Sequence, residues 1–164
     1  MRVLGIDPGY GIVGYGVIDV NQNGISVIDY GAVTTPKEMT LPERLNIIHK
    51  CFCEIMETFK PDEVAIEELF FFRNFTTAIP VAEARGIIIN ACYGFTKRIF
   101  EYTPLQIKQA LTGVGRAEKK QVQFMVKNIL GLKDVPKPDD VADALAVAVC
   151  HSQINSNLNV NMMR

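Results

Sequence analysis

Three apolar segments fill the start of the chain before any helical pattern begins, and they constrain the fold more than any other feature. Residues 2–7 (RVLGID) are a short apolar run, residues 13–20 (VGYGVIDV) alternate small or apolar side chains, and residues 25–33 (ISVIDYGAV) form a third such run. The turn sequence NQNG joins the last two. The pattern predicts three consecutive antiparallel strands.

The same region contains a glycine pattern that must be interpreted with care. Gly9, Gly11 and Gly14 match G-x-G-x-x-G, and Asp29 follows at the distance of a ribose-binding acid. A dinucleotide site needs these glycines to open a helix, whose N-terminus holds the pyrophosphate. Here they lead into a strand, so we expect no cofactor-binding residues and interpret the glycines as part of a tight hairpin.

The remainder of the chain alternates helices and strands. Apolar periodicity and the Gly and Pro positions predict five helices and two strands. The predicted order is βββαβαβααα, which implies an α/β domain with a mixed five-stranded sheet and helices on both faces. We expect one domain over residues 1–153 and a polar, flexible tail over residues 154–164. The helices are expected at residues 41–60, 76–95, 105–111, 117–130 and 139–152, and the strands at 63–68 and 98–104.

Composition excludes several classes of protein. The 164 residues are 48% hydrophobic and 21% charged, as in an ordinary globular domain. No apolar run reaches the length of a membrane span, and the chain begins with a strand, so we expect a cytoplasmic protein without a membrane partner. The four cysteines form no C-x-x-C pair and are expected to be reduced.

Charge is distributed unevenly along the chain. The formal net charge is −1, yet residues 97–137 carry nine Lys or Arg side chains against three Asp or Glu. A basic segment of this kind favours a polyanionic partner, although a solvated helical face is the simpler interpretation.

Four acidic residues follow or precede strongly apolar segments. Asp7 and Glu67 end predicted strands, and Asp140 and Asp143 share one face of the last helix. Each has an ordinary alternative, namely a turn former, a rim residue or a favourable charge at a helix N-terminus. Asp143, however, enters a wholly apolar helix and needs a partner. Carboxylates without Cys or His favour Mg²⁺.

Several segments together closely resemble the RuvC-type Holliday junction resolvases, which have a ribonuclease H-like fold. The resemblance covers about nine-tenths of the chain and implies a nuclease that resolves four-way DNA junctions by paired symmetric nicks. Metal-activated water would leave 5′-phosphate and 3′-hydroxyl ends. The segments are GIDPGYGIVGYGVI, VAIEELFF, AEARGIII, YTPLQIKQALTGVGRAEKKQVQFMV and PDDVADALAVAVCHS.

The resemblance also implies the catalytic and metal-binding residues. They are Asp7, Glu67, Asp140 and Asp143, which would hold two Mg²⁺ ions, with Mn²⁺ as a substitute. Asp139 is an alternative to Asp140. The D-x-x-D spacing favours Asp140, which would leave Asp139 as a helix cap.

The resemblance implies DNA contacts as well. Lys108 and Lys119 would hold phosphates, and Lys120 is an alternative to Lys119. Phe70 would insert at the junction crossover, although residues 70–72 are all phenylalanine and the choice among them is open. Arg73 would contact the DNA backbone.

The expected assembly is a homodimer that uses the apolar segment 76–95, with a branch-migration helicase complex of the RuvA and RuvB type as partner. Three other functions are weighed against this one. They are a ribonuclease H-like RNA-processing nuclease, a phosphotransferase of the actin-like fold, and a DNA-binding module without catalysis. The short chain argues against the phosphotransferase, and the four carboxylates argue against the module.

Overall fold

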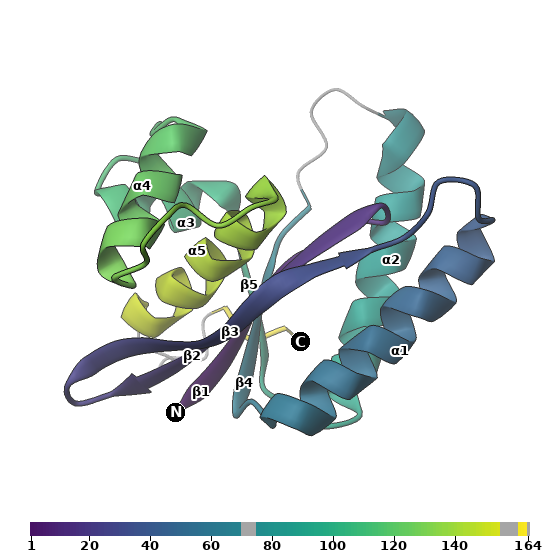
Figure 1. Ribbon diagram of the computed structural model, residues 1–164, viewed down its shortest axis with the longest axis horizontal. Helices are drawn as coiled ribbons and strands as arrows, with labels where there is room; N and C mark the ends of the chain where they lie inside the picture. The colour runs from purple at the N-terminus through teal and green to yellow at the C-terminus, as the bar shows by residue number, and fades with distance from the viewer. Residues whose placement is uncertain (70–74, 155–160, 164) are drawn as a thin grey trace.

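The computed structural model describes residues 1–69, 75–154 and 161–163, and it contains a mixed five-stranded sheet flanked by helices (Figure 1). The sheet order is β3-β2-β1-β4-β5. The predicted fold class and element order are therefore confirmed. The strands are β1 (Arg2–Asp7), β2 (Ile12–Asn21), β3 (Gly24–Thr34), β4 (Glu63–Glu67) and β5 (Ile99–Tyr102), and the helices are α1 (Leu41–Phe59), α2 (Phe75–Tyr93), α3 (Pro104–Thr112), α4 (Lys119–Ile129) and α5 (Asp139–Gln153).

Strand directions decide where the acidic residues end up. β1, β2 and β3 form an antiparallel meander, whereas β4 pairs with β1 in parallel. Ile6 pairs with Ile66 across β1 and β4, so Asp7 and Glu67, one residue further along, emerge at the same edge of the sheet. Strand ends at one edge are where open α/β sheets bind ligands.

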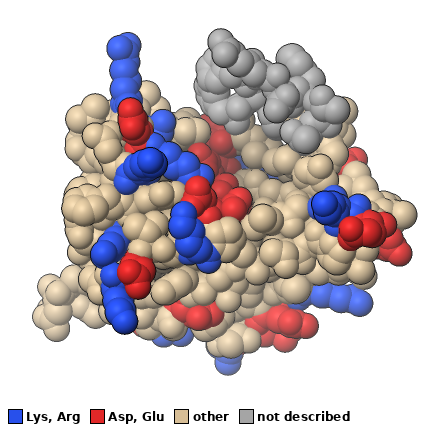
Figure 2. Space-filling view, turned by 45° about the horizontal axis from the view of Figure 1, so that its top comes forward, with Lys and Arg blue, Asp and Glu red and all other residues tan. Residues whose placement is uncertain are grey.

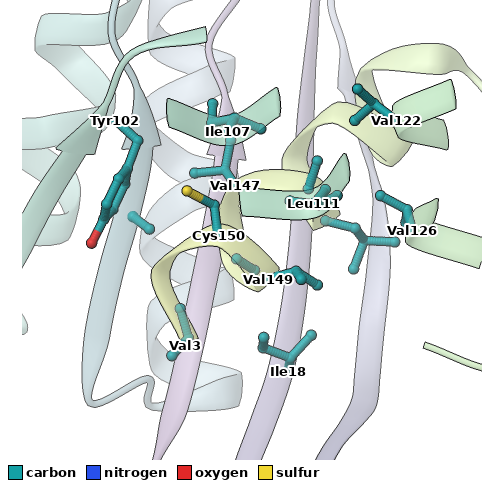
Figure 3. Close-up of a cluster of buried hydrophobic side chains, with 14 of the residues drawn as sticks. Val3, Ile18, Tyr102, Ile107, Leu111, Val122, Val126, Val147, Val149 and Cys150 are labelled. Atoms are coloured by element: carbon teal, nitrogen blue, oxygen red, sulfur yellow. The ribbon is translucent and has the colours of Figure 1, made fainter. Parts of the chain in front are cut away.

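Helices cover the two faces unequally. α1 and α2 pack on one face, and α3, α4 and α5 lie on the other (Figure 1). The core under the second group joins α5 to the sheet, and the side chains of Val147 and Val149 point into the same interior as Val3 and Ile18 (Figure 3). Every residue of α5 from Ala144 to His151 is buried. A helix this apolar must lie inside the molecule.

Three glycines let α5 lie close against the sheet. A Cβ atom on Gly14 would stand 1.9 Å from the backbone oxygen of Asp140, and one on Gly5 would stand 2.3 Å from that of Ala144. Gly16 faces Leu145 in the same way. The glycine-rich start of the chain therefore serves helix–sheet packing as much as the hairpin turn.

Capping explains where the helices begin. Thr103 caps α3, with Pro104 in the first turn, so β5 ends earlier and α3 begins earlier than the periodicity predicts. Glu118 caps α4, which begins at Lys119. α5 begins after Pro138 without a side-chain cap, so the expectation that Asp139 is a helix cap is wrong. Asp139 is the first helical residue, and lysines hold its carboxylate.

The cysteines, the helix lengths and the C-terminal tail can also be compared with what the sequence predicts. The four cysteines are free, two of them buried, as expected. Within the segments that the structure describes, no helix is long and apolar enough to cross a membrane. Residues 161–163 of the expected tail lie beside β5, where Glu101 donates a backbone hydrogen bond to Asn161 and Met163 donates one to Ile99.

Candidate active site

Carboxylates from three elements converge at the edge where β1 and β4 end. Asp7 and Glu67 end neighbouring strands, and the first turns of α5 bring Asp140 and Asp143 to them. Burial and, to a smaller extent, the nearby charges of Glu67, Asp143 and Asp140 together raise the pKa of Asp7 to about 8. The charges of all three other carboxylates therefore act on Asp7.

Glu67 is perturbed for the same reasons. Burial raises its pKa to about 7, and the charge of Asp143 adds to the shift, whereas a hydrogen bond with Asp7 and the charges of Lys119 and Lys108 oppose it. Buried carboxylates that repel one another favour a shared proton or a cation. The negative charge of the site therefore favours the binding of a cation.

Lys119 supplies part of that charge. Its Nζ lies 2.7 Å from Oδ2 of Asp143 and 3.8 Å from Oδ2 of Asp139. Burial still raises the pKa of Asp143, while the hydrogen bond from Lys119 opposes the rise. Asp139 also pairs with Lys137, whose Nζ lies 2.7 Å from Oδ1, and this contact lowers the pKa of Asp139. Lysines thus hold Asp139 on the outer side of the cluster.

A cavity of about 270 Å³ opens beside the carboxylates. Its charged lining residues are Glu67, Lys108, Lys119 and Asp143, and its other walls come from α3, α4 and α5. Acidic and basic groups lie next to each other on this face of the molecule (Figure 2). Two lysines and several carboxylates in one cavity can hold a phosphate beside bound cations.

The structure separates the two adjacent lysines. Lys119 lines the cavity at the carboxylates, whereas Lys120 lines a second cavity of about 470 Å³ with Arg116 and Phe124. The Phe124 side chain is 59% exposed. Of the two lysines, Lys119 is therefore the one in reach of the carboxylate cluster. Phe70 and Arg73, the other expected DNA contacts, lie outside the described residues.

Sequence reasoning missed Arg85, which supports the site from α2. Its Nε donates to the backbone oxygen of Glu67 at 3.4 Å, and its Nη2 pairs with Glu101 of β5 at 2.8 Å. Through these two contacts, Arg85 of α2 links the end of β4 to β5. The segment AEARGIII contains two charged residues, Glu83 and Arg85, and the basic one beside the apolar stretch GIII was the available signal.

The donor set fits a hard divalent cation by its chemistry. The cluster offers carboxylate oxygens on half-buried side chains, which is the ligand type that Mg²⁺ prefers. Across residues 1–69, 75–154 and 161–163, no three His, Cys, Asp or Glu side chains are arranged to hold a metal ion. Asp143 is paired with Lys119, whose ammonium group neutralises part of the charge that this carboxylate could offer to a cation.

Comparisons with known proteins agree with one another. The family model described as "Crossover junction endodeoxyribonuclease RuvC" matches residues 3–151. The RuvC of Clostridioides difficile is 55% identical over 155 residues, which are 94% of this chain and 92% of that protein. The RuvC of Alkaliphilus oremlandii is 55% identical over 152 residues, which are 93% of each chain.

Solved structures give the same result. The Thermus thermophilus RuvC structure has a TM-score of 0.89 and 36% identity, and the match covers 99% of each chain. A structure of T. thermophilus RuvC in complex with a Holliday junction substrate has a TM-score of 0.87 and 39% identity, with 94% of each chain covered.

Proposed function

Because this chain belongs to the family of RuvC crossover junction endodeoxyribonucleases, we propose that it resolves four-way DNA junctions by hydrolysing phosphodiester bonds. The observation that carries this proposal is the single cavity in which Glu67 and Asp143 face Lys108 and Lys119, with the half-buried Asp7 at the neighbouring strand end. That cavity offers carboxylates for cations and ammonium groups for the phosphate of the scissile strand.

The four carboxylates are the proposed ligands of two Mg²⁺ ions, with Mn²⁺ as a substitute. When bound, such ions activate a water molecule and stabilise the leaving oxygen of the phosphodiester. Asp7 and Glu67 are anchored at strand ends, and Asp140 is anchored by the tight packing of α5 on Gly14. The products would carry 5′-phosphate and 3′-hydroxyl ends.

The lysines are proposed to position the DNA. Lys108 and Lys119 lie in the carboxylate cavity, where they can hold the phosphate being cut. Lys120, in the neighbouring cavity, is placed to contact the strand further along. Phe70 as the residue at the crossover and Arg73 as a backbone contact remain predictions.

Two symmetric nicks need two active sites, and a homodimer would supply them. The surface around α2 supports this part of the proposal, because Ile79 is 68% exposed, Tyr93 52% and Phe95 47%. Exposed apolar side chains of this size are typical of an interface. A branch-migration complex of the RuvA and RuvB type remains the expected partner.

The proposal is tested by cleavage of three labelled substrates in Mg²⁺, namely a four-way junction, linear duplex DNA and structured RNA. We expect paired nicks in opposite strands of the junction, with ligatable ends, and little cutting of the other two. Preferential cutting of RNA would support the RNA-processing alternative instead. Asp7→Asn should stop cleavage while junction binding, measured by mobility shift, persists. Loss of both together would contradict the role of Asp7 as a metal ligand.

A further inference from the structure

Asp143 stands between two groups that compete for it. On one side are Asp7 and Glu67, whose pKa values respond to its charge. On the other side is Lys119 at the start of α4, whose Nζ lies 2.7 Å from its Oδ2. Asp143 cannot serve both sides fully, because an ammonium group at this distance neutralises the negative charge that would attract a cation.

The position of Lys119 is set by the packing of α4. Val122 and Val126 of that helix are buried in the core that contains α5, so these contacts fix the position of α4 against α5. Asp139 and Asp143 lie one turn apart on α5, and Lys119 contacts both. Its side chain is 53% exposed, however, and it is long enough to swing away from Asp143 toward the cavity.

We propose that Lys119 is an internal counter-ion that occupies Asp143 in the metal-free protein and is displaced when a divalent cation binds. This inference rests on the proposed function. The displaced ammonium group becomes available to a DNA phosphate in the same cavity, where Lys108 already lies. Metal loading and DNA binding are therefore coupled through one side chain.

The coupling has a defined direction. A cation that takes Asp143 releases Lys119 for the phosphate, and a phosphate that holds Lys119 leaves Asp143 free for the cation. Each ligand therefore raises the affinity for the other by the same factor, as linkage requires. Because the pair is half-exposed, the factor is expected to be about 2-fold to 5-fold.

The test compares Lys119→Met with Lys120→Met, which removes the same charge from the adjacent residue outside the carboxylate cavity. Affinity for Mg²⁺ without DNA is measured by calorimetry, and circular dichroism checks folding. We expect Lys119→Met to bind Mg²⁺ about 2-fold to 5-fold more tightly than wild type, and Lys120→Met to bind it as wild type does. Lys119→Arg retains the cation and should bind Mg²⁺ no more tightly than wild type.

Junction binding gives a second measurement without cleavage. Affinity for a four-way junction is compared in EDTA and in Ca²⁺, which also takes oxygen ligands. The gain from Ca²⁺ should be smaller in Lys119→Met than in wild type or Lys120→Met. Unchanged or weaker Mg²⁺ binding by Lys119→Met would overturn the inference. If wild type itself bound no divalent cation, the proposed function would fail first, so the two failures can be told apart.

Discussion

The two ends of β4 carry glutamates in opposite situations. Glu63 begins the strand and is 3% exposed, yet it is fully paired. Its Oε1 accepts from Arg98, and its Oε2 lies 2.5 Å from Nε2 of His151, whose Nδ1 lies 2.7 Å from the Tyr102 hydroxyl. The fold itself supplies every partner of this buried carboxylate.

Glu67 ends the same strand among carboxylates. Burial and the charge of Asp143 raise its pKa, and the hydrogen bond with Asp7 and the charges of the two lysines oppose this effect only in part. A buried charge costs stability unless it is paired. Glu63 is therefore structural, because its charge is neutralised within the chain. Glu67 instead belongs to a site whose charge is to be balanced by a bound ligand. Four predictions test this contrast.

The largest effect is expected from Glu67→Gln. Loss of one proposed metal ligand should reduce junction cleavage by about 1000-fold, since metal stabilisation of the transition state is worth several kcal/mol. The free energy of unfolding without metal should not fall, because the change removes a repelled charge. Single-turnover cleavage and urea unfolding measure the two quantities. A less stable protein would show that Glu67 is already satisfied by the fold.

Glu63→Gln should have the reverse profile. Breaking a buried ion pair leaves partners without a counter-charge, and we expect a loss of about 3 kcal/mol in the free energy of unfolding. Cleavage per folded molecule should stay near the wild-type value at low temperature, because Glu63 lies at the far end of β4 from Glu67. An equally stable variant with poor cleavage would reverse the assignment of the two ends.

Gly14→Ala tests how the acidic end is held together. The added Cβ would stand 1.9 Å from the backbone oxygen of Asp140, so α5 must shift. Overpacking of this kind costs about 1–3 kcal/mol, and the displaced carboxylates should slow cleavage as well. Gly94→Ala is the matched control, because its Cβ would make an ordinary 3.4 Å contact. Equal behaviour of the two variants would contradict the packing argument.

The smallest effect concerns pH. Asp7 has an ordinary pKa of 3.8 when unfolded and about 8 in the folded, metal-free protein. Between these values the folded state holds the proton more strongly, so stability falls as pH rises from 4 to 8. We therefore expect the melting temperature in EDTA to drop over this range.

Asp7→Asn should flatten that dependence, whereas Glu63→Gln should leave it in place at a lower melting temperature. A pH profile that Asp7→Asn leaves unchanged would show that another group is responsible.

Much of the fold was predictable, because its signals are local. The three-strand start, the element order and the core helix α5 follow from apolar periodicity and from turn and cap residues, each of which acts within a few positions. The family resemblance assigned the four carboxylates to Asp7, Glu67, Asp140 and Asp143, and the parallel pairing of β1 and β4 then explains why Asp7 and Glu67 lie at neighbouring strand ends.

Other features depend on contacts between distant segments. The sequence could not distinguish Lys119 from Lys120, since both are exposed lysines in one helical turn, until the packing of α4 placed one of them at Asp143. Asp139 was expected to cap α5 and instead pairs with Lys137 and Lys119. Arg85 and Glu63 gained their roles only from partners on other strands and helices.

By itself, the sequence determined which elements form, in what order, and which chemical groups the chain carries. The tertiary structure alone decided which carboxylate is neutralised and which is left for a ligand, as the two ends of β4 show. The physical reason is that charge pairing and burial depend on distances of a few ångströms between residues far apart in the chain. A local sequence pattern does not specify those distances.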